Sequence, residues 1–369
     1  MKFQIEQKDL YEGIQIVQKA VANKQTMPIL TGIYLEAKKD KGLHLIGTDL
    51  ELGIEHYINA DIKEEGSIVI PANSFTQLVR ELPKEKINFD VDLDNYQINL
   101  SCSNSKFNLK GYDPDEYPQL PEINVPENFT LATEDLKKLI REVEFSTSND
   151  ETQPALTGSL FNINENEIIM VSTNTYRLAY SRMETDFNFE KKEEIEIILP
   201  SKTLNELTRL LDGEKVEIFV DSNYIKFNFQ DITIISRLIE GKFPNYRQVM
   251  PDKYNTKVFV DKKPLQNAVK RASLIAKMDS NVLNLKIKDN KLIINSANSE
   301  QGYAHEEINI DVEGPDQKIT IDAGYLLDVL KIIDDDKVTL ELIGPLNPFT
   351  LKKVDNDNYI YLIMPVRSD

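Results

Sequence analysis

Few residues in this 369-residue sequence have the chemistry of a catalytic or metal-binding group. The three histidines, His44, His56 and His305, are far apart in the sequence, and none has a metal-binding partner at helical spacing. The single cysteine, Cys102, lies in a predicted strand with no histidine nearby, so we interpret it as a buried structural residue rather than a nucleophile. A lone cysteine also excludes an intramolecular disulfide and a thiolate-rich zinc site.

The densest run of carboxylates, Asp334 to Asp336, lies between a predicted helix and a predicted strand. Acidic residues are routine in such turns, so this run favours a solvated turn over a Mg²⁺ site. The sequence contains neither a P-loop nor a Gly-x-Gly-x-x-Gly motif, which disfavours nucleotide hydrolysis. We therefore expect a protein that is not an enzyme, with no catalytic residue, no metal and no cofactor.

The composition is that of a folded protein, with 41% hydrophobic and 28% charged residues. A chain of this length exceeds one ordinary hydrophobic core and predicts two or three domains. The first ten residues lack a secretory signal, and no run of eighteen apolar residues occurs. The sequence thus predicts a soluble, cytoplasmic protein without a membrane partner.

One sequence pattern occurs three times and organises the whole chain. Ile70–Leu78 resembles Leu199–Leu207, and Ile321–Val329 follows the same apolar rhythm, at offsets of 129 and 122 residues. Each copy is followed by strands of period-two alternation and preceded by a strand and an amphipathic helix. Proline-containing linkers at 111–121 and 241–251 separate the copies.

The repeat predicts three domains, 1–124, 125–250 and 251–369. Each combines two helices with antiparallel strands, an α+β arrangement in which the helices pack on one face of the sheet. The six expected helices are 8–24, 72–81, 133–144, 201–211, 262–277 and 323–333. Repeated domains occur in proteins of many kinds, so triplication alone does not decide how the chains assemble.

Charge is distributed unevenly between the expected helices and the rest of the chain. The net charge is −18, which argues against a protein that coats nucleic acid with its whole surface. The six helices nevertheless carry a net +6, which leaves −24 for the sheets and loops. This segregation favours a helical surface that faces phosphate, although exposed helix faces carry lysines in many proteins. No helix has an Arg or Asn cluster suited to reading bases.

The sequence resembles, from end to end, the beta subunit of bacterial DNA polymerase III, the sliding clamp family. The matching motifs are Thr26–Leu30, Leu156–Gly158, Thr173 with Arg177–Leu178, Gly241–Pro251 and Tyr361–Arg367. The resemblance implies three DNA-clamp domains per chain and a head-to-tail homodimer that closes a ring around duplex DNA. It also implies a processivity factor that binds DNA without sequence specificity. Its implied partners are DNA polymerase III, other replication or repair proteins that dock through short peptides, and a clamp loader.

The resemblance places functional residues at three sites. A cleft for partner peptides is expected at Leu156, Thr173, Tyr176, Arg177, Leu178, Pro244, Val249, Leu346, Ile363, Met364, Pro365, Val366 and Arg367. The dimer seam is expected at Lys106, Phe107, Leu109, Leu274, Ile275, Glu300 and Glu306, with Lys106 facing one of the two glutamates. The basic residues expected to face DNA are Lys24, Arg80, Lys137, Lys138, Arg141, Lys202, Arg209 and Lys270.

Several of these residues have a second interpretation. Leu156, Leu178 and Ile363 are also what a hydrophobic core requires, and Phe107 and Leu109 fit the core of a strand equally well. The sequence departs from the family pattern at Gln153 and at Asn174-Thr175-Tyr176, which affects the expected DNA path and the polarity of the cleft. The alternative function is an acidic peptide-binding hub that does not encircle DNA.

Overall fold

The computed structural model describes the chain except for residues 23–26, 124–127, 186–193, 278–279, 299–301 and 367–369. The chain forms two compact units. The first unit contains residues 1–136 and 205–238, and the second contains residues 137–204 and 239–369. Residues of the expected central domain are therefore divided between the two units.

The first unit contains two antiparallel sheets. The five-stranded sheet has the order β5 (Asp61–Glu64), β1 (Lys2–Glu6), β7 (Lys86–Asp92), β8 (Gln97–Cys102) and β9 (Ser105–Lys110). The eight-stranded sheet has the order β10 (Asn128–Ala132), β15 (Lys215–Val220), β16 (Tyr224–Phe229), β17 (Ile232–Arg237), β4 (Leu52–Ile58), β3 (Gly42–Thr48), β2 (Gly32–Lys38) and β6 (Gly66–Pro71). Cys102 is buried at the end of β8, as its sequence context predicts.

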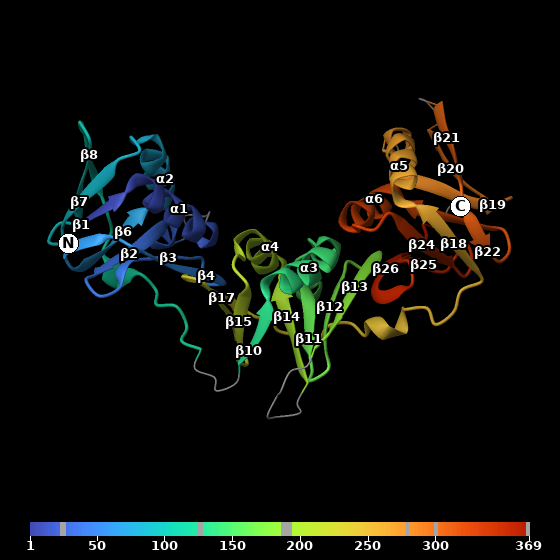
Figure 1. Cartoon of the computed structure of the whole chain (residues 1–369), viewed down its shortest axis with the longest axis horizontal. Coiled ribbons are helices and arrows are strands. Elements are labelled where there is room, and N and C mark those ends of the chain that lie inside the picture. Colours follow the sequence, from blue (N-terminus) through green and yellow to red (C-terminus); the bar gives the residue numbers. More distant parts are fainter. Residues whose placement is uncertain (23–26, 124–127, 186–193, 278–279, 299–301, 367–369) are drawn as a thin grey trace. The chain divides into compact units, whose positions relative to one another are not determined.

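Two helices of the first unit, α1 (Gln7–Val17) and α2 (Ala72–Glu81), lie side by side against the strands (Figure 1). Leu10, Ile14 and Val17 recur at spacings of four and three, and all three are fully buried. Burial of this stripe, rather than helix propensity, is what stabilises a helix of eleven residues.

The first helix is shorter than the sequence predicts. It ends at Val17 and continues as the 3₁₀ turn Gln18–Ala20, so residues 21 and 22 are not helical. The Gln18 side chain is hydrogen-bonded to α2, and the N–H of Ala22 donates to the carbonyl of Leu30 at 3.0 Å. These long-range bonds compete with the next helical turn, and the sequence pattern does not reveal them. Lys24 lies outside the described residues.

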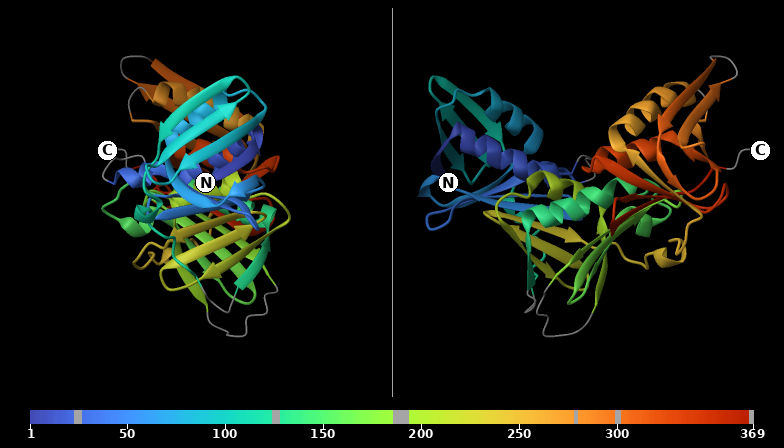
Figure 2. Two further views of the ribbon diagram at one scale, coloured as in Figure 1. Left: turned by 90° about the vertical axis from the view of Figure 1, so that its left-hand side faces the viewer. Right: turned by 45° about the vertical axis from the view of Figure 1, so that its right-hand side comes forward.

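The second unit has a nine-stranded and a four-stranded antiparallel sheet. The nine-stranded sheet has the order β14 (Ile195–Pro200), β11 (Gly158–Ile163), β12 (Glu167–Thr173), β13 (Arg177–Glu184), β26 (Asn356–Ile363), β25 (Phe349–Lys353), β24 (Lys337–Leu342), β18 (Thr256–Asp261) and β22 (Asp311–Glu313). The four-stranded sheet has the order β21 (Gly302–Asn309), β20 (Lys291–Asn298), β19 (Val282–Lys288) and β23 (Gln317–Asp322). Helix α5 (Lys262–Ala276) lies along β20 and β21 and packs on α6 (Ala323–Ile332), as the right view of Figure 2 shows for the orange segments.

Helices α3 (Thr133–Val143) and α4 (Ser201–Leu210) each contribute residues to both units. The threefold repeat is visible at the strand–helix junctions, where β6, β14 and β23 end directly before α2, α4 and α6. Pro71 and Pro200 close the first two of these strands, and Asp322 closes the third. The Asp322 carboxylate accepts the N–H groups of Gly324 and Tyr325 and so caps α6.

Within the described ranges, no helix is long and apolar enough to cross a bilayer. The same part of the chain contains no cluster of three His, Cys, Asp or Glu residues arranged to hold a metal ion.

Candidate functional site

The candidate site is built where the last strand of the chain joins the central strands. Strands β13 and β26 are antiparallel neighbours, with Leu178 opposite Leu362 and Arg177 opposite Ile363. Because side chains alternate across a sheet, the two leucines share one face and Arg177 with Ile363 shares the other. The two faces therefore have different environments.

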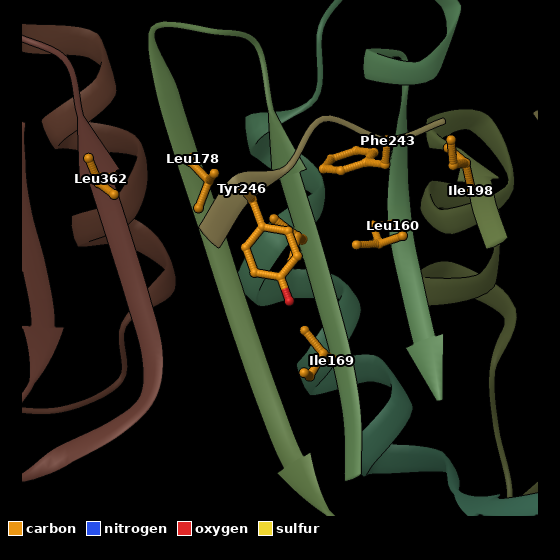
Figure 3. Close-up of a cluster of buried hydrophobic side chains, with 8 residues drawn as sticks. Leu160, Ile169, Leu178, Ile198, Phe243, Tyr246 and Leu362 are labelled. Atoms are coloured by element: carbon orange, nitrogen blue, oxygen red, sulfur yellow. The ribbon is translucent and has the colours of Figure 1, made fainter. Parts of the chain in front are cut away.

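The leucine face is covered by the linker that follows β17. Phe243 and Tyr246 of this linker pack on Leu160, Ile169 and the two paired leucines in one buried cluster, which also includes Val171 and Ile198. Figure 3 shows the linker crossing the strands with both aromatic rings over the sheet, and Leu362 on the neighbouring strand. Burying these aliphatic and aromatic side chains fixes the linker against the sheet.

A pocket of about 240 Å³ lies beside this cluster. Its lining residues are predominantly apolar. They come from the sheet, the linker, the end of β26, the 3₁₀ turn Pro154–Leu156 and the turn between β12 and β13: Leu156, Thr173, Thr175, Arg177, Leu178, Pro244, Asn245, Tyr246, Val249, Leu362 and Met364. Val249 and Met364 are 48% and 39% exposed, so they lie at the rim. A concave apolar surface with a few polar groups suits a short peptide or another small ligand.

The turn between β12 and β13 holds one edge of the pocket. The Asn174 side chain accepts the N–H groups of Tyr176 and Arg177, at 3.1 and 3.0 Å. Thr175 occupies the left-handed region with a φ of 74°, and the Thr173 hydroxyl donates to the carbonyl of Arg177 at 2.7 Å. The Tyr176 carbonyl then accepts the N–H of Met364 at 2.8 Å, which ties the chain end to the turn.

Arg177 is the most constrained charged residue near the pocket. Its guanidinium forms an ion pair with Asp328 of α6 at 2.8 Å and donates to the carbonyl of Phe145. It also lies over the ring of Tyr325, 4.7 Å from the centroid. Only 11% of its side chain is exposed. Arg177 therefore links β13 to α6, and its charge is directed away from solvent.

The structure brings together seven of the residues expected to form the cleft: Leu156, Thr173, Arg177, Leu178, Pro244, Val249 and Met364. Tyr176 and Leu346 are 63% and 73% exposed but do not line the pocket. Ile363 is fully buried on the opposite face, and its neighbour Leu362 lines the pocket instead.

Pro365 and Val366 follow the rim, with the N–H of Val366 donating to the carbonyl of Thr320 at 2.8 Å. Arg367 lies outside the described residues. Four lining residues were missed from the sequence: Thr175, Asn245, Tyr246 and Leu362. For Tyr246 and Leu362 the only signal in the sequence is that each is an apolar residue within two positions of a predicted cleft residue, Pro244 and Ile363 respectively.

The described residues expected at the dimer seam lie on two outer strands and on helix α5. Lys106, Phe107 and Leu109 belong to β9, the outer strand of the five-stranded sheet, and Phe107 is 38% exposed. Leu274 and Ile275 lie on α5, with Leu274 63% exposed.

Glu306 is on β21, the outer strand of the four-stranded sheet. It accepts two hydrogen bonds from Arg271, at 2.7 and 2.6 Å, which hold the pKa of its carboxyl below the ordinary value. One of the two carboxylates expected to face Lys106 is thus already engaged by an arginine of its own chain. Glu300 lies outside the described residues.

The basic residues expected to face DNA fall into two groups. Lys138, Arg141, Lys202 and Lys270 are exposed, and Lys137 is half-buried. Arg80 is paired with Glu81 at 2.9 Å and Arg209 with Glu206 at 2.8 Å. Glu206 also binds Lys19 at 3.2 Å, so the charges of the second group are partly neutralised within the chain.

Comparison with known proteins gives the family. The family models of the N-terminal, central and C-terminal domains of the DNA polymerase III beta subunit match residues 1–121, 130–245 and 247–367 of this chain. The chain belongs to the DNA polymerase III beta subunit family. It is thus a sliding clamp of the replication machinery, with three clamp domains.

Individual clamps agree over the whole length. The beta sliding clamp of Staphylococcus epidermidis is 34% identical, with 100% of each chain covered. The structure of the Bacillus subtilis sliding clamp superposes with a TM-score of 0.95 at 32% identity, and that of the Streptococcus pneumoniae beta chain with 0.94 at 31%, each covering 100% of both chains. The clamp fold expected from the sequence is therefore confirmed.

Proposed function

We propose that two copies of this clamp chain associate head to tail into a ring that encircles duplex DNA. In this proposal the domains are residues 1–124, 125–250 and 251–369, and three similar modules per chain give the sixfold repeat that a closed ring of two chains requires. The whole-length family match carries the proposal. The threefold recurrence of the strand–helix junction supports it.

In the proposed dimer, the outer strand β9 of one chain faces the outer strand β21 and helix α5 of the other. Outer strands have unpaired backbone groups, and proteins normally protect them. Phe107 and Leu274 are large apolar side chains exposed at these edges, as an interface requires. Lys106 and Glu306 supply opposite charges across the same seam, with Glu300 as the other candidate partner of Lys106.

The apolar pocket is the proposed docking site for DNA polymerase III and for other replication or repair proteins. A partner peptide would insert apolar side chains between Leu178, Pro244 and Met364, and a methionine at the rim adapts to different side chains. We retain Tyr176, Leu346, Pro365, Val366 and Arg367 as an outer rim of the site.

The DNA path is proposed to follow the basic helix residues named above, including Lys24. Contacts between lysine or arginine and phosphate are independent of base sequence, so they hold the duplex without fixing its register. A closed ring then stays on DNA for topological reasons, and a clamp loader must open it. A tethered polymerase gains effective concentration at the primer end, so processivity needs no catalytic residue or cofactor.

Linearisation of the DNA tests the ring. The chain is loaded by the host clamp loader onto a nicked circular plasmid, and unbound protein is removed by gel filtration. Cleavage at one restriction site should release the clamp within minutes, because the ring slides off the ends, whereas the uncut circle retains it. A clamp that stays equally on both molecules, or leaves both, would instead favour the peptide-binding hub that does not encircle DNA.

Substitution of Met364 by aspartate tests the pocket. A charge at this apolar rim should weaken binding of a labelled peptide from the polymerase partner by roughly tenfold, since desolvating a carboxylate beside leucines costs more than 1 kcal/mol. Fluorescence anisotropy measures the affinity. Leu93→Asp is the matched control, because Leu93 is 40% exposed, belongs to the first unit and does not line the pocket. Equal affinity of M364D and the unmodified chain would place the docking site elsewhere.

A further inference from the structure

A second cavity, of about 820 Å³, lies entirely within the first unit. One wall is a face of the eight-stranded sheet, and the other is residues 114–123, which we call the strap. The Tyr117 hydroxyl donates to the carbonyl of Ile46 at 3.3 Å, and Lys226 donates to the carbonyl of Ile123 at 3.2 Å. These bonds attach the strap to the sheet at Tyr117 and at Ile123. The cavity between strap and sheet is therefore held by specific contacts of the fold.

The sheet wall carries two rows of side chains set by strand register. Glu36, His44 and Tyr57 are opposite one another on β2, β3 and β4. The next row contains Tyr34 and Glu55. Residues directly opposite one another in a sheet project from the same face, so both rows point into the space under the strap.

Within these rows, two stacked aromatic rings lie between carboxylates. The rings of His44 and Tyr57 stack with centroids 4.1 Å apart and planes 1° apart. The two ring nitrogens of His44 lie 3.8 Å from a Glu36 carboxylate oxygen and 3.6 Å from a Glu55 carboxylate oxygen. The buried Nε2 atom of His44 has no hydrogen-bond partner among the described residues. This polar centre therefore has unused hydrogen-bonding capacity.

The charges around the cavity are unequal. Four carboxylates line it, from Glu36, Glu55, Asp115 and Glu122, against two ammonium groups, from Lys38 and Lys226. Both lysines are already engaged, Lys38 by Glu36 at 2.9 Å and Lys226 by the strap and the ring of Phe219. In the described part of the chain, Glu55 has no lysine or arginine within ion-pair distance.

The tyrosines report the same negative environment. Burial raises the pKa of the Tyr57 hydroxyl, and the neighbouring Glu55 carboxylate raises it further. Burial, together with Glu36 and Asp115, likewise raises the pKa of Tyr34. Carboxylates on low-dielectric walls concentrate negative potential in a cleft, and aromatic faces attract cations. A guanidinium group satisfies both features, since it stacks on rings and binds carboxylates with paired hydrogen bonds.

We propose that this cavity is a second docking site of the clamp, which takes a basic segment of a partner protein through arginine or lysine side chains. Its volume exceeds that of one side chain and suits several residues of a peptide. The linker after the first repeat covers this site, just as the linker with Phe243 and Pro244 borders the apolar pocket. The two linkers thus border an acidic cavity in the first unit and an apolar pocket in the second. A partner that bound both sites at once would gain affinity, because binding at one site raises its effective concentration at the other.

The histidine rings provide a direct readout, because the chain contains only three. The full-length chain is prepared with isotope-labelled histidine and titrated with the capped peptide acetyl-Gly-Arg-Arg-Gly-amide, and separately with the same peptide bearing neutral citrulline at both arginine positions. The arginine peptide should shift the His44 ring signals saturably and leave those of His305, which lies in the other unit, unchanged. The citrulline peptide should give no saturable shift.

Two isosteric variants locate the site. Glu55→Gln removes one carboxylate without changing shape and should weaken the arginine peptide at least about tenfold. Glu217→Gln makes the same charge change in the same register row, three strands away and outside the cavity, and should bind like the unmodified chain. Tyr57→Phe, which keeps the ring, should retain binding and so shows that substitution on this face leaves the cavity intact.

Four results would overturn the proposal. The first is the absence of a saturable His44 shift, and the second is equal binding of the citrulline peptide. The third is equal weakening by E55Q and E217Q, which would indicate diffuse attraction to an acidic surface. Binding of arginine amide as tight as that of the peptide would assign the cavity to a small cationic molecule and would also reject a protein segment as its occupant.

Discussion

Arg177 shows at the scale of one residue how a predicted ligand-binding group acts as a structural link. The Arg177 side chain, which forms an ion pair with Asp328 and donates to the Phe145 carbonyl, is only 11% exposed. Removing one member of such a pair leaves the other without its partner. Because Asp328 is 35% exposed and also binds Lys331, water and that lysine compensate in part. We expect Arg177→Ala to lower the free energy of unfolding by about 2–3 kcal/mol.

Urea unfolding followed by circular dichroism measures this loss. Arg182→Ala on the same strand is the control, since Arg182 is 38% exposed and its ion pair with Glu167 should contribute about 0–1 kcal/mol. An equal loss from R177A and R182A would mean that the link to α6 contributes nothing beyond a surface ion pair.

Residue identities at the pocket were partly readable from the sequence. Leu178 and Met364 follow from motif positions, and the structure places both at the pocket. Leu362 and Ile363 are adjacent in the strand, so their side chains lie on opposite faces of the sheet. Which of the two faces the pocket depends on the register of β26 with β13. Register with a strand nearly two hundred residues away is a long-range property. The position of Tyr246 likewise depends on how the linker folds back on the sheet.

The outer strand β9 combines an unpaired sheet edge with the exposed ring of Phe107. If this edge forms the seam, burial of the ring supplies a large part of the binding energy. We expect Phe107→Asp to raise the dissociation constant of the dimer by roughly thirtyfold or more, which corresponds to about 2 kcal/mol. Sedimentation equilibrium over a dilution series measures the constant.

Leu50→Asp is the matched control for the seam. Leu50 is 51% exposed with a φ of 78°, a backbone conformation that aspartate tolerates, so this variant adds a surface charge without strain. Its dimer constant should not change. A strictly monomeric unmodified chain at micromolar concentration, or a dimer unaffected by F107D, would contradict the proposed seam.

The elements themselves were largely predictable because the apolar periodicity is strong. The second helix has the predicted bounds, and four others begin at the predicted residue and end within one residue of the predicted end. The exception is the C-terminal part of the first helix, where side-chain bonds from Gln18 to α2 decide the end. The repeat also predicted the strand–helix junctions at Pro71, Pro200 and Asp322. Pairing of β4 with β17 and of β13 with β26 could not be read from local patterns.

A clamp chain with a net charge of −18 must bind a polyanion such as DNA through a limited set of basic side chains. Lys138 and Arg141 on α3 and Lys270 on α5 are exposed helix residues that form no ion pair within the described part of the chain. Phosphate contact by such residues releases counterions, so affinity falls steeply with salt. In the proposed DNA path, acidic sheets and loops would repel the duplex and favour its contact with the basic helix residues.

Replacing Lys138, Arg141 and Lys270 together by alanine should therefore reduce the salt dependence as well as the affinity. Each lost phosphate contact lowers the magnitude of the slope of log K against log salt by about 0.9. Because the dimer carries the three substitutions in both chains, the triple variant should lose up to about 5 units of slope. Binding of the preformed dimer to a short duplex is measured by anisotropy across a salt series. The control replaces Lys41, Lys84 and Lys253, which are exposed residues outside the helices, and removes the same charge. Because long-range attraction responds to net charge alone whereas counterion release needs contact, equal slopes for the two variants would show that these helices do not face the DNA.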